Sequence, residues 1–105
     1  MLLREIAHSR AGDKGDISNI SVIAFKMEDF ALLEKHVTVE RVKDHFRGVV
    51  RGEVVRYALP ALGALNFVMH DALGGGVTRS LNLDTHGKCL ASGILTLDLP
   101  VEPRL

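Results

Sequence analysis

One stretch of the sequence decides the fold of this 105-residue chain: Ser18-Asn19-Ile20-Ser21-Val22-Ile23-Ala24-Phe25. It is rich in β-branched residues and nearly all apolar after its start, which predicts a central strand covered on both faces. Upstream, Leu2 to His8 predicts a short strand. The glycine-containing segment Ser9 to Asp16, which separates the two strands, predicts a loop.

Two helices are expected after the central strand. Met27 to His36 has acidic residues near its start and basic residues near its end, the arrangement that a helix dipole favours. Thr38 predicts the N-cap of a second helix. Apolar residues recur in it at helical spacing: Val39, Val42, Phe46 and Val49. Gly48 or Gly52 would end this helix.

The second half of the chain predicts further strands. Glu53 to Leu59 alternates, with Val55, Tyr57 and Leu59 on one face, and Pro60 ends it. Ala61 to Leu73 has apolar residues at helical spacing and favours a helix, with a strand as the alternative. Residues 80–83 and 90–99 predict a terminal hairpin. This order predicts the α+β class: a mainly antiparallel sheet with two helices on one face.

Composition limits the classes of function. The length predicts one domain over residues 1–105. Thirteen basic residues balance thirteen acidic ones, so no net charge attracts nucleic acid or an anionic membrane, and we expect neither as a partner. Zero net charge with 47% hydrophobic residues predicts a homo-oligomer or docking on a larger protein. The single cysteine and the lack of a long apolar run predict a cytoplasmic location.

The first candidate binding site is the polar segment that precedes the central strand. Its candidate residues are Arg10, Gly12, Asp13, Lys14, Gly15, Asp16 and, at the next strand, Asn19. Glycines let the main chain approach a ligand closely, and Arg10 and Lys14 suit a carboxylate or phosphate group. The alternative is a solvated turn whose charges satisfy one another.

The second candidate site lies between the predicted helix and the terminal hairpin. Its candidate residues are Asn66, Gly74, Gly75, Gly76, Thr78 and Arg79. On a helix, the spacing of four residues puts Asn66 and His70 on one face. The three glycines would leave a bare main chain for a flat substrate. The alternative is that these glycines only end a helix and form a turn.

Histidines offer the only candidate catalytic groups. His8 and His70 would act as an acid-base or metal-binding pair if the fold brought them together. No group of histidine, cysteine and acidic residues has the spacing of a recognised metal site, so we expect no metal and no cofactor.

Three segments in this order resemble the C-terminal domain of the acyclic-terpene-utilisation protein A family: His8 to Asp16, Tyr57 to Phe67 and Ala72 to Leu81. The resemblance implies a ferredoxin-like fold. It also implies a role in the breakdown of acyclic terpenes through acyl-CoA intermediates, alongside biotin-dependent acyl-CoA carboxylase subunits. In this family a much larger domain usually precedes the C-terminal one, and we expect the present chain to be a stand-alone copy.

The hypothesis that follows is an accessory binding domain of acyl-CoA catabolism. It would recognise an anionic acyl-CoA-type ligand, or dock on a larger partner such as the family's large domain or an acyl-CoA carboxylase subunit. Two alternatives stay open. One is a small enzyme at a dimer interface, with His8 or His70 as acid or base and Asn66 polarising a carbonyl group. The other is a structural oligomerisation module. We expect the isolated chain not to be an enzyme.

Overall fold

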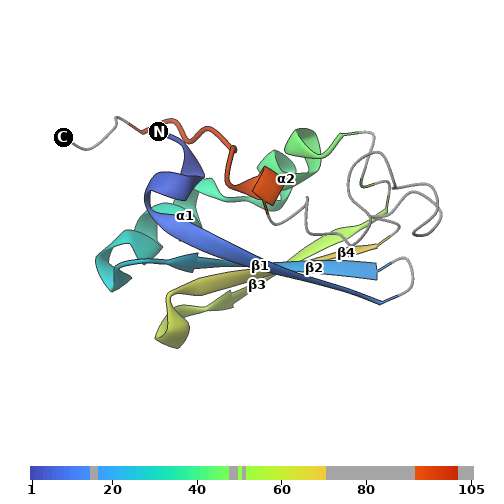
Figure 1. Ribbon diagram of the computed structural model, residues 1–105, viewed down its shortest axis with the longest axis horizontal. Helices are drawn as coiled ribbons and strands as arrows, with labels where there is room; N and C mark the ends of the chain where they lie inside the picture. Colours follow the sequence, from blue (N-terminus) through green and yellow to red (C-terminus); the bar gives the residue numbers. More distant parts are fainter. Residues whose placement is uncertain (15–16, 48–49, 51, 71–91, 102–105) are drawn as a thin grey trace.

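The computed structural model describes residues 1–14, 17–47, 50, 52–70 and 92–101. Its centre is a four-stranded antiparallel sheet in the order β1-β2-β4-β3 (Figure 1). The strands are β1 (Ala7–Lys14), β2 (Ile17–Ala24), β3 (Val54–Leu59) and β4 (Ala64–His70). Helices cover one face of this sheet, which confirms the predicted α+β class.

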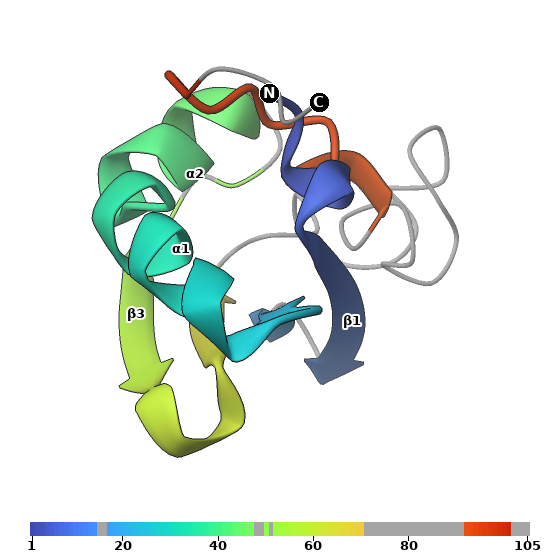
Figure 2. The same ribbon diagram turned by 90° about the vertical axis from the view of Figure 1, so that its left-hand side faces the viewer.

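The helical layer lies between β2 and β3 in the sequence (Figure 2). A short 3-10 helix, η2 (Met27–Asp29), leads into α1 (Phe30–His36), and α2 (Val39–His45) follows. Both predicted helices are confirmed. The Thr38 hydroxyl accepts a hydrogen bond of 3.2 Å from the main-chain nitrogen of Arg41, so Thr38 is the predicted N-cap. The α2 helix ends at His45, before either glycine expected to end it.

The strand β2 occupies the middle of the sheet, as predicted, but the described elements cover only one of its faces. Ile20 and Val22 are fully buried against the helices. On the opposite face Asn19 is exposed and Ile17 is 39% exposed. The prediction of a strand covered on both faces is therefore wrong, because both described helices pack on the same side.

The predicted boundary between the first strand and the polar loop is wrong. Leu3–Glu5 forms a 3-10 helix, η1, and β1 runs through most of the expected loop. Eight residues of β1 pair with β2, from Ala7 opposite Ala24 to Lys14 opposite Ile17. These pairings satisfy the main-chain groups of a segment whose side chains alone have little preference for a strand.

The predicted helix over Ala61 to Leu73 is also wrong, and the strand alternative is correct for its centre. A 3-10 turn, η3 (Pro60–Leu62), is followed by Gly63 in the left-handed conformation (φ 63°), which reverses the chain into β4. In β4 the alternating residues Leu65, Phe67 and Met69 are fully buried. Pairing with β2 and β3 on either side outweighs the helical spacing of the apolar residues.

Residues 92–101 return to the N-terminus (Figure 2). Residues 92–94 form a helical turn, and only an isolated bridge between Leu2 and Asp98 has strand geometry, so the predicted strand over 90–99 is wrong in its described part. The main-chain nitrogen of Leu3 donates to the carbonyl oxygen of Leu97 at 2.9 Å. Residues 71–91, with the first strand of the predicted hairpin, lie outside the described residues.

One hydrophobic core fills the space between the sheet and the layer above it. Helices, strands and the C-terminal segment all contribute fully buried side chains, among them Leu3, Ile20, Leu33, Val42, Phe67 and Ile94. Aliphatic residues supply most of this core, as the low aromatic content of the sequence requires. Within the described part of the chain, no helix is both long enough and apolar enough to cross a lipid bilayer.

Candidate binding face of the sheet

The face of the sheet opposite the helices presents side chains in rows that run across the four strands. We call it the open face. Paired residues of adjacent strands point to the same side, so the register defines each row. Three rows cross all four strands: His8-Ile23-Ala64-Leu59, Arg10-Ser21-Asn66-Tyr57 and Gly12-Asn19-Val68-Val55. A fourth row, Lys14-Ile17-His70, ends beside Glu53, whose carbonyl oxygen accepts from the His70 nitrogen at 2.9 Å.

The middle row is polar along its whole length, and we call it the central polar row. Arg10 and Tyr57 lie at its two ends on the outer strands β1 and β3, and both are exposed, Tyr57 by 54%. Between them the Asn66 amide donates a hydrogen bond of 2.9 Å to the Ser21 hydroxyl. The inner pair is thus fixed, while the two ends face solvent.

The sheet brings together candidates from both predicted sites. The open face holds His8, Arg10, Gly12, Asn19, Asn66 and His70. Asn66 and His70 share a face as predicted, but they do so on a strand, where every second residue points the same way. In the register, Asp13 lies opposite Ser18 and Lys14 opposite Ile17. The remaining candidates lie outside the described residues: Gly15, Asp16, Gly74, Gly75, Gly76, Thr78 and Arg79.

The two candidate catalytic histidines do not form a pair. His8 lies opposite Ile23 and His70 opposite Ile17, which places them six positions apart along β2. That separation is roughly 20 Å at the rise of a strand. The His8 ring instead stacks on Phe25, with 5.4 Å between ring centroids and 21° between ring planes. A shared acid-base or metal site of these two residues is therefore ruled out.

The open face is positive around the central polar row. The three rows that cross all four strands contain Arg10 and no aspartate or glutamate, and Glu53 lies beyond them, beside His70. The Arg10 side chain makes no hydrogen bond or ion pair with any other described residue, while its main chain pairs with Ser21. Its guanidinium group is therefore available to a carboxylate or phosphate group from outside the domain.

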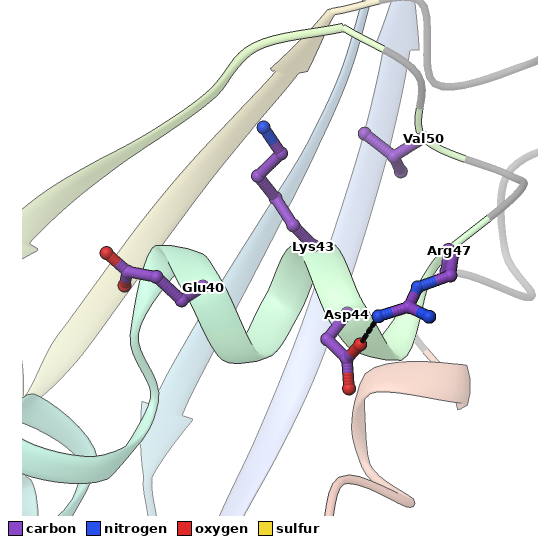
Figure 3. A pocket seen from close by; sticks show the side chains of 5 residues that line it. All are labelled: Glu40, Lys43, Asp44, Arg47 and Val50. Carbon is purple, nitrogen blue, oxygen red and sulfur yellow. Dashed lines mark hydrogen bonds and ion pairs between the residues drawn. The ribbon is translucent and has the colours of Figure 1, made fainter.

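Two hollows of the described surface lie beside α2. One, of about 400 Å³, is lined by Glu40, Lys43, Asp44, Arg47 and Val50 (Figure 3). Arg47 and Asp44 form an ion pair there, while Glu40 and Lys43 point away from it. The other, of about 250 Å³, is lined by Arg41, Asp44, His45, Leu97 and Asp98. Because both hollows mix charges of opposite sign, neither favours a charged ligand.

Two residues of the central polar row, Ser21 and Tyr57, are not among the candidates that the sequence predicts. The sequence predicts Ser21 in a strand buried on both sides and Tyr57 on the same face as Val55 and Leu59. Pairing with a polar residue of the adjacent strand identifies them, since Ser21 pairs with Arg10 and Tyr57 pairs with Asn66.

Among the described residues, no group of three or more histidine, cysteine or acidic side chains is placed to hold a metal ion.

Comparison with known families agrees with this architecture. The model of the AtuA ferredoxin-like domain matches residues 1–100. The chain belongs to this family. The match spans the central polar row and every described helix and strand of this AtuA ferredoxin-like domain. No curated protein and no solved structure matches the domain significantly.

Proposed function

We propose that this AtuA ferredoxin-like domain is an accessory binding domain of acyl-CoA catabolism, of the acyclic terpene type, that docks on a larger protein through its open face. The observation that carries the proposal is the exposed Arg10 side chain, which has no partner among the described residues and lies among three adjacent rows without a carboxylate. Such a face fits a surface that supplies the missing negative charge.

The size and composition of the open face support protein docking. The sheet is four strands wide and, along β1, eight residues long, so its flat area is roughly 500 Å² at ordinary strand spacing and rise. The side chains that project from it add further surface. A standard interface buries about 800 Å² on each partner. Arginine and tyrosine are enriched among the residues that dominate binding energy, and Arg10 and Tyr57 lie at the ends of one row.

The partners to be tested are the large domain found in the same family and acyl-CoA carboxylase subunits. The immobilised domain is incubated with each purified candidate, and bound protein is quantified. We expect Arg10→Ala and Tyr57→Ala each to weaken capture by about tenfold or more. Arg4→Ala is the matched control, because Arg4 is an exposed cation on η1, away from the open face, and it should leave capture unchanged.

A second arm measures binding of an acyl-CoA thioester to the same variants by calorimetry. Loss of thioester binding in Arg10→Ala, with no protein captured by the wild type, would mean that the face recognises the anionic ligand itself. Equal capture by the wild type, Arg10→Ala and Tyr57→Ala would refute the open face as the docking surface.

A further inference from the structure

We propose that a second surface, at one end of the sheet, associates with the same surface of a second copy of this chain. This corner patch consists of Phe25, Met27 and Leu62, with Lys26 and Glu28 interleaved in the sequence. It goes beyond the proposed function, because it lies outside the central polar row and its partner is the domain itself.

The corner patch contains the most exposed large hydrophobic side chains of the described residues. Phe25 is 60% exposed, Met27 59% and Leu62 66%. At about 200 Å² for a large side chain, these fractions leave roughly 350 Å² of apolar surface in water. This extent is in the range of the largest apolar patch on a typical monomer, and such patches often have a function.

These residues come from two segments that lie side by side. The β3–β4 turn and the start of the helical layer lie at the same end of the sheet (Figure 1). The main-chain nitrogen of Ala24 donates to the carbonyl oxygen of Gly63 at 2.9 Å. A Cβ atom on Gly63 would come within 2.8 Å of the Met27 sulfur, so Met27 lies directly against the turn that carries Leu62. The patch is therefore continuous across both segments.

The charges around Met27 indicate why the partner is a second copy. Lys26 and Glu28 are both exposed, and neither forms an ion pair with another described residue. When two copies meet about a twofold axis through their Met27 side chains, Lys26 of each would lie opposite Glu28 of the other. The segment is thus complementary to itself, as a twofold interface requires. The domain as a whole has zero formal net charge, so long-range repulsion between copies is weak.

The open face would not associate with itself in this way. Face-to-face packing of two open faces would bring Arg10 of both copies onto one interface, with no carboxylate in the three rows that cross all four strands. Like charges that face each other in an interface are unfavourable. The two surfaces therefore take different partners. Phe25 of the corner patch stacks on His8 at the edge of the open face, and a dimer through the patch leaves the central polar row of both copies accessible.

The strength of this association follows from its area. Roughly 350 Å² on each copy is less than half of the ~800 Å² per partner in a standard interface. We therefore expect a reversible monomer–dimer equilibrium that shifts with protein concentration. Since exposed ion pairs add little energy, the apolar side chains drive the contact and the charges align it.

Sedimentation equilibrium over a series of protein concentrations tests the proposal. We expect Leu62→Asp to be monomeric throughout the series. Lys26→Glu should raise the dimer dissociation constant by about tenfold or more, because it places glutamates opposite glutamates. The double variant Lys26→Glu/Glu28→Lys should restore dissociation to within about threefold of the wild type, since it exchanges the two charges and keeps their complementarity.

Two controls keep the result specific. Circular dichroism should show the same fold in each variant, because all the substituted side chains are exposed. Arg10→Ala should dimerise like the wild type. A wild type that stays monomeric, a Lys26→Glu variant that dimerises normally, a double variant that does not recover, or a dimer lost in Arg10→Ala would each overturn the corner patch as the contact. None of these outcomes depends on whether the open face binds a partner.

Discussion

Gly52 lies directly against the main chain of His70. The main-chain nitrogen of Gly52 donates to the carbonyl oxygen of His70 at 3.0 Å. A Cβ atom on Gly52 would come within 2.5 Å of that same oxygen. Only glycine fits between the two segments, so Gly52 fixes how the chain enters β3 beside the end of β4.

We expect Gly52→Ala to destabilise the domain by about 1–3 kcal/mol, because the rigid main chain of β4 must shift to admit the methyl group. Urea denaturation followed by circular dichroism measures this loss. Gly12→Ala is the matched control: its Cβ would meet only the Asn19 side chain, at an ordinary 3.5 Å, and its stability should be unchanged or slightly higher. Equal midpoints for the wild type and Gly52→Ala would contradict the close approach.

Arg56 on β3 fixes the C-terminal end of α1. Its guanidinium group donates to the carbonyl oxygens of Glu34 and Val37, at 2.9 and 3.0 Å. These carbonyls lie at the end of the helix, where a positive charge also meets the helix dipole favourably. Loss of the side chain in Arg56→Ala should therefore lower the free energy of unfolding by about 1 kcal/mol.

Arg56→Lys distinguishes geometry from charge in the same denaturation experiment. Lysine keeps the positive charge but lacks the planar group that reaches two carbonyl oxygens at once. An intermediate stability is expected for Arg56→Lys. Wild-type stability in Arg56→Ala would mean that the two hydrogen bonds contribute nothing measurable.

His36 makes the stability depend on pH near neutrality. Desolvation of its imidazole, with smaller contributions from the positive charges of Lys35 and Arg41, holds the pKa of His36 below 6.5 in the folded domain. The unfolded chain therefore binds this proton more readily than the folded one. The stabilisation from the neutral ring is complete above pH 6.5 and declines as the pH falls from there toward the lower folded pKa.

Urea unfolding between about pH 7.5 and about pH 5 measures this dependence. In His36→Gln the free energy of unfolding should change less with pH over this range, because the titrating ring is absent. Lys35→Gln should make the slope shallower, because one of the charges that lower the pKa is removed. A slope in His36→Gln as steep as that of the wild type would assign the effect to other groups.

The sequence predicts the parts of the fold whose local signals agree with the final packing. The second helix is an example, because Thr38 caps the α2 main chain and Val42 is buried one turn later. The β4 segment shows the opposite case. Leu62, Leu65 and Met69 fit a helix, whereas the same segment in the sheet buries Leu65 and Met69 by alternation. Neighbouring strands on both sides decide between the two, and no short window of sequence contains them.

The candidate site was predicted in its residues but not in its geometry. The sequence predicts a loop around Arg10, because the glycine, alanine and charged residues near it have little preference for a strand. Its position on a strand comes from pairing with β2, and that pairing alone puts Arg10 opposite Ser21 and in one row with Asn66. Residues far apart in sequence share the open face because the register of the whole sheet is fixed, which composition and spacing cannot reveal.

The central position of β2 also bears on how the domain folds. Its contacts with β1 are local, since Lys14 pairs with Ile17, and a hairpin of this kind closes in microseconds. Its contacts with β4 are distant, because Ile23 pairs with Ala64 across both helices and β3. Such non-local pairing slows folding. During synthesis the edge of β2 that pairs with β4 therefore stays unpaired until the ribosome has released the chain through His70.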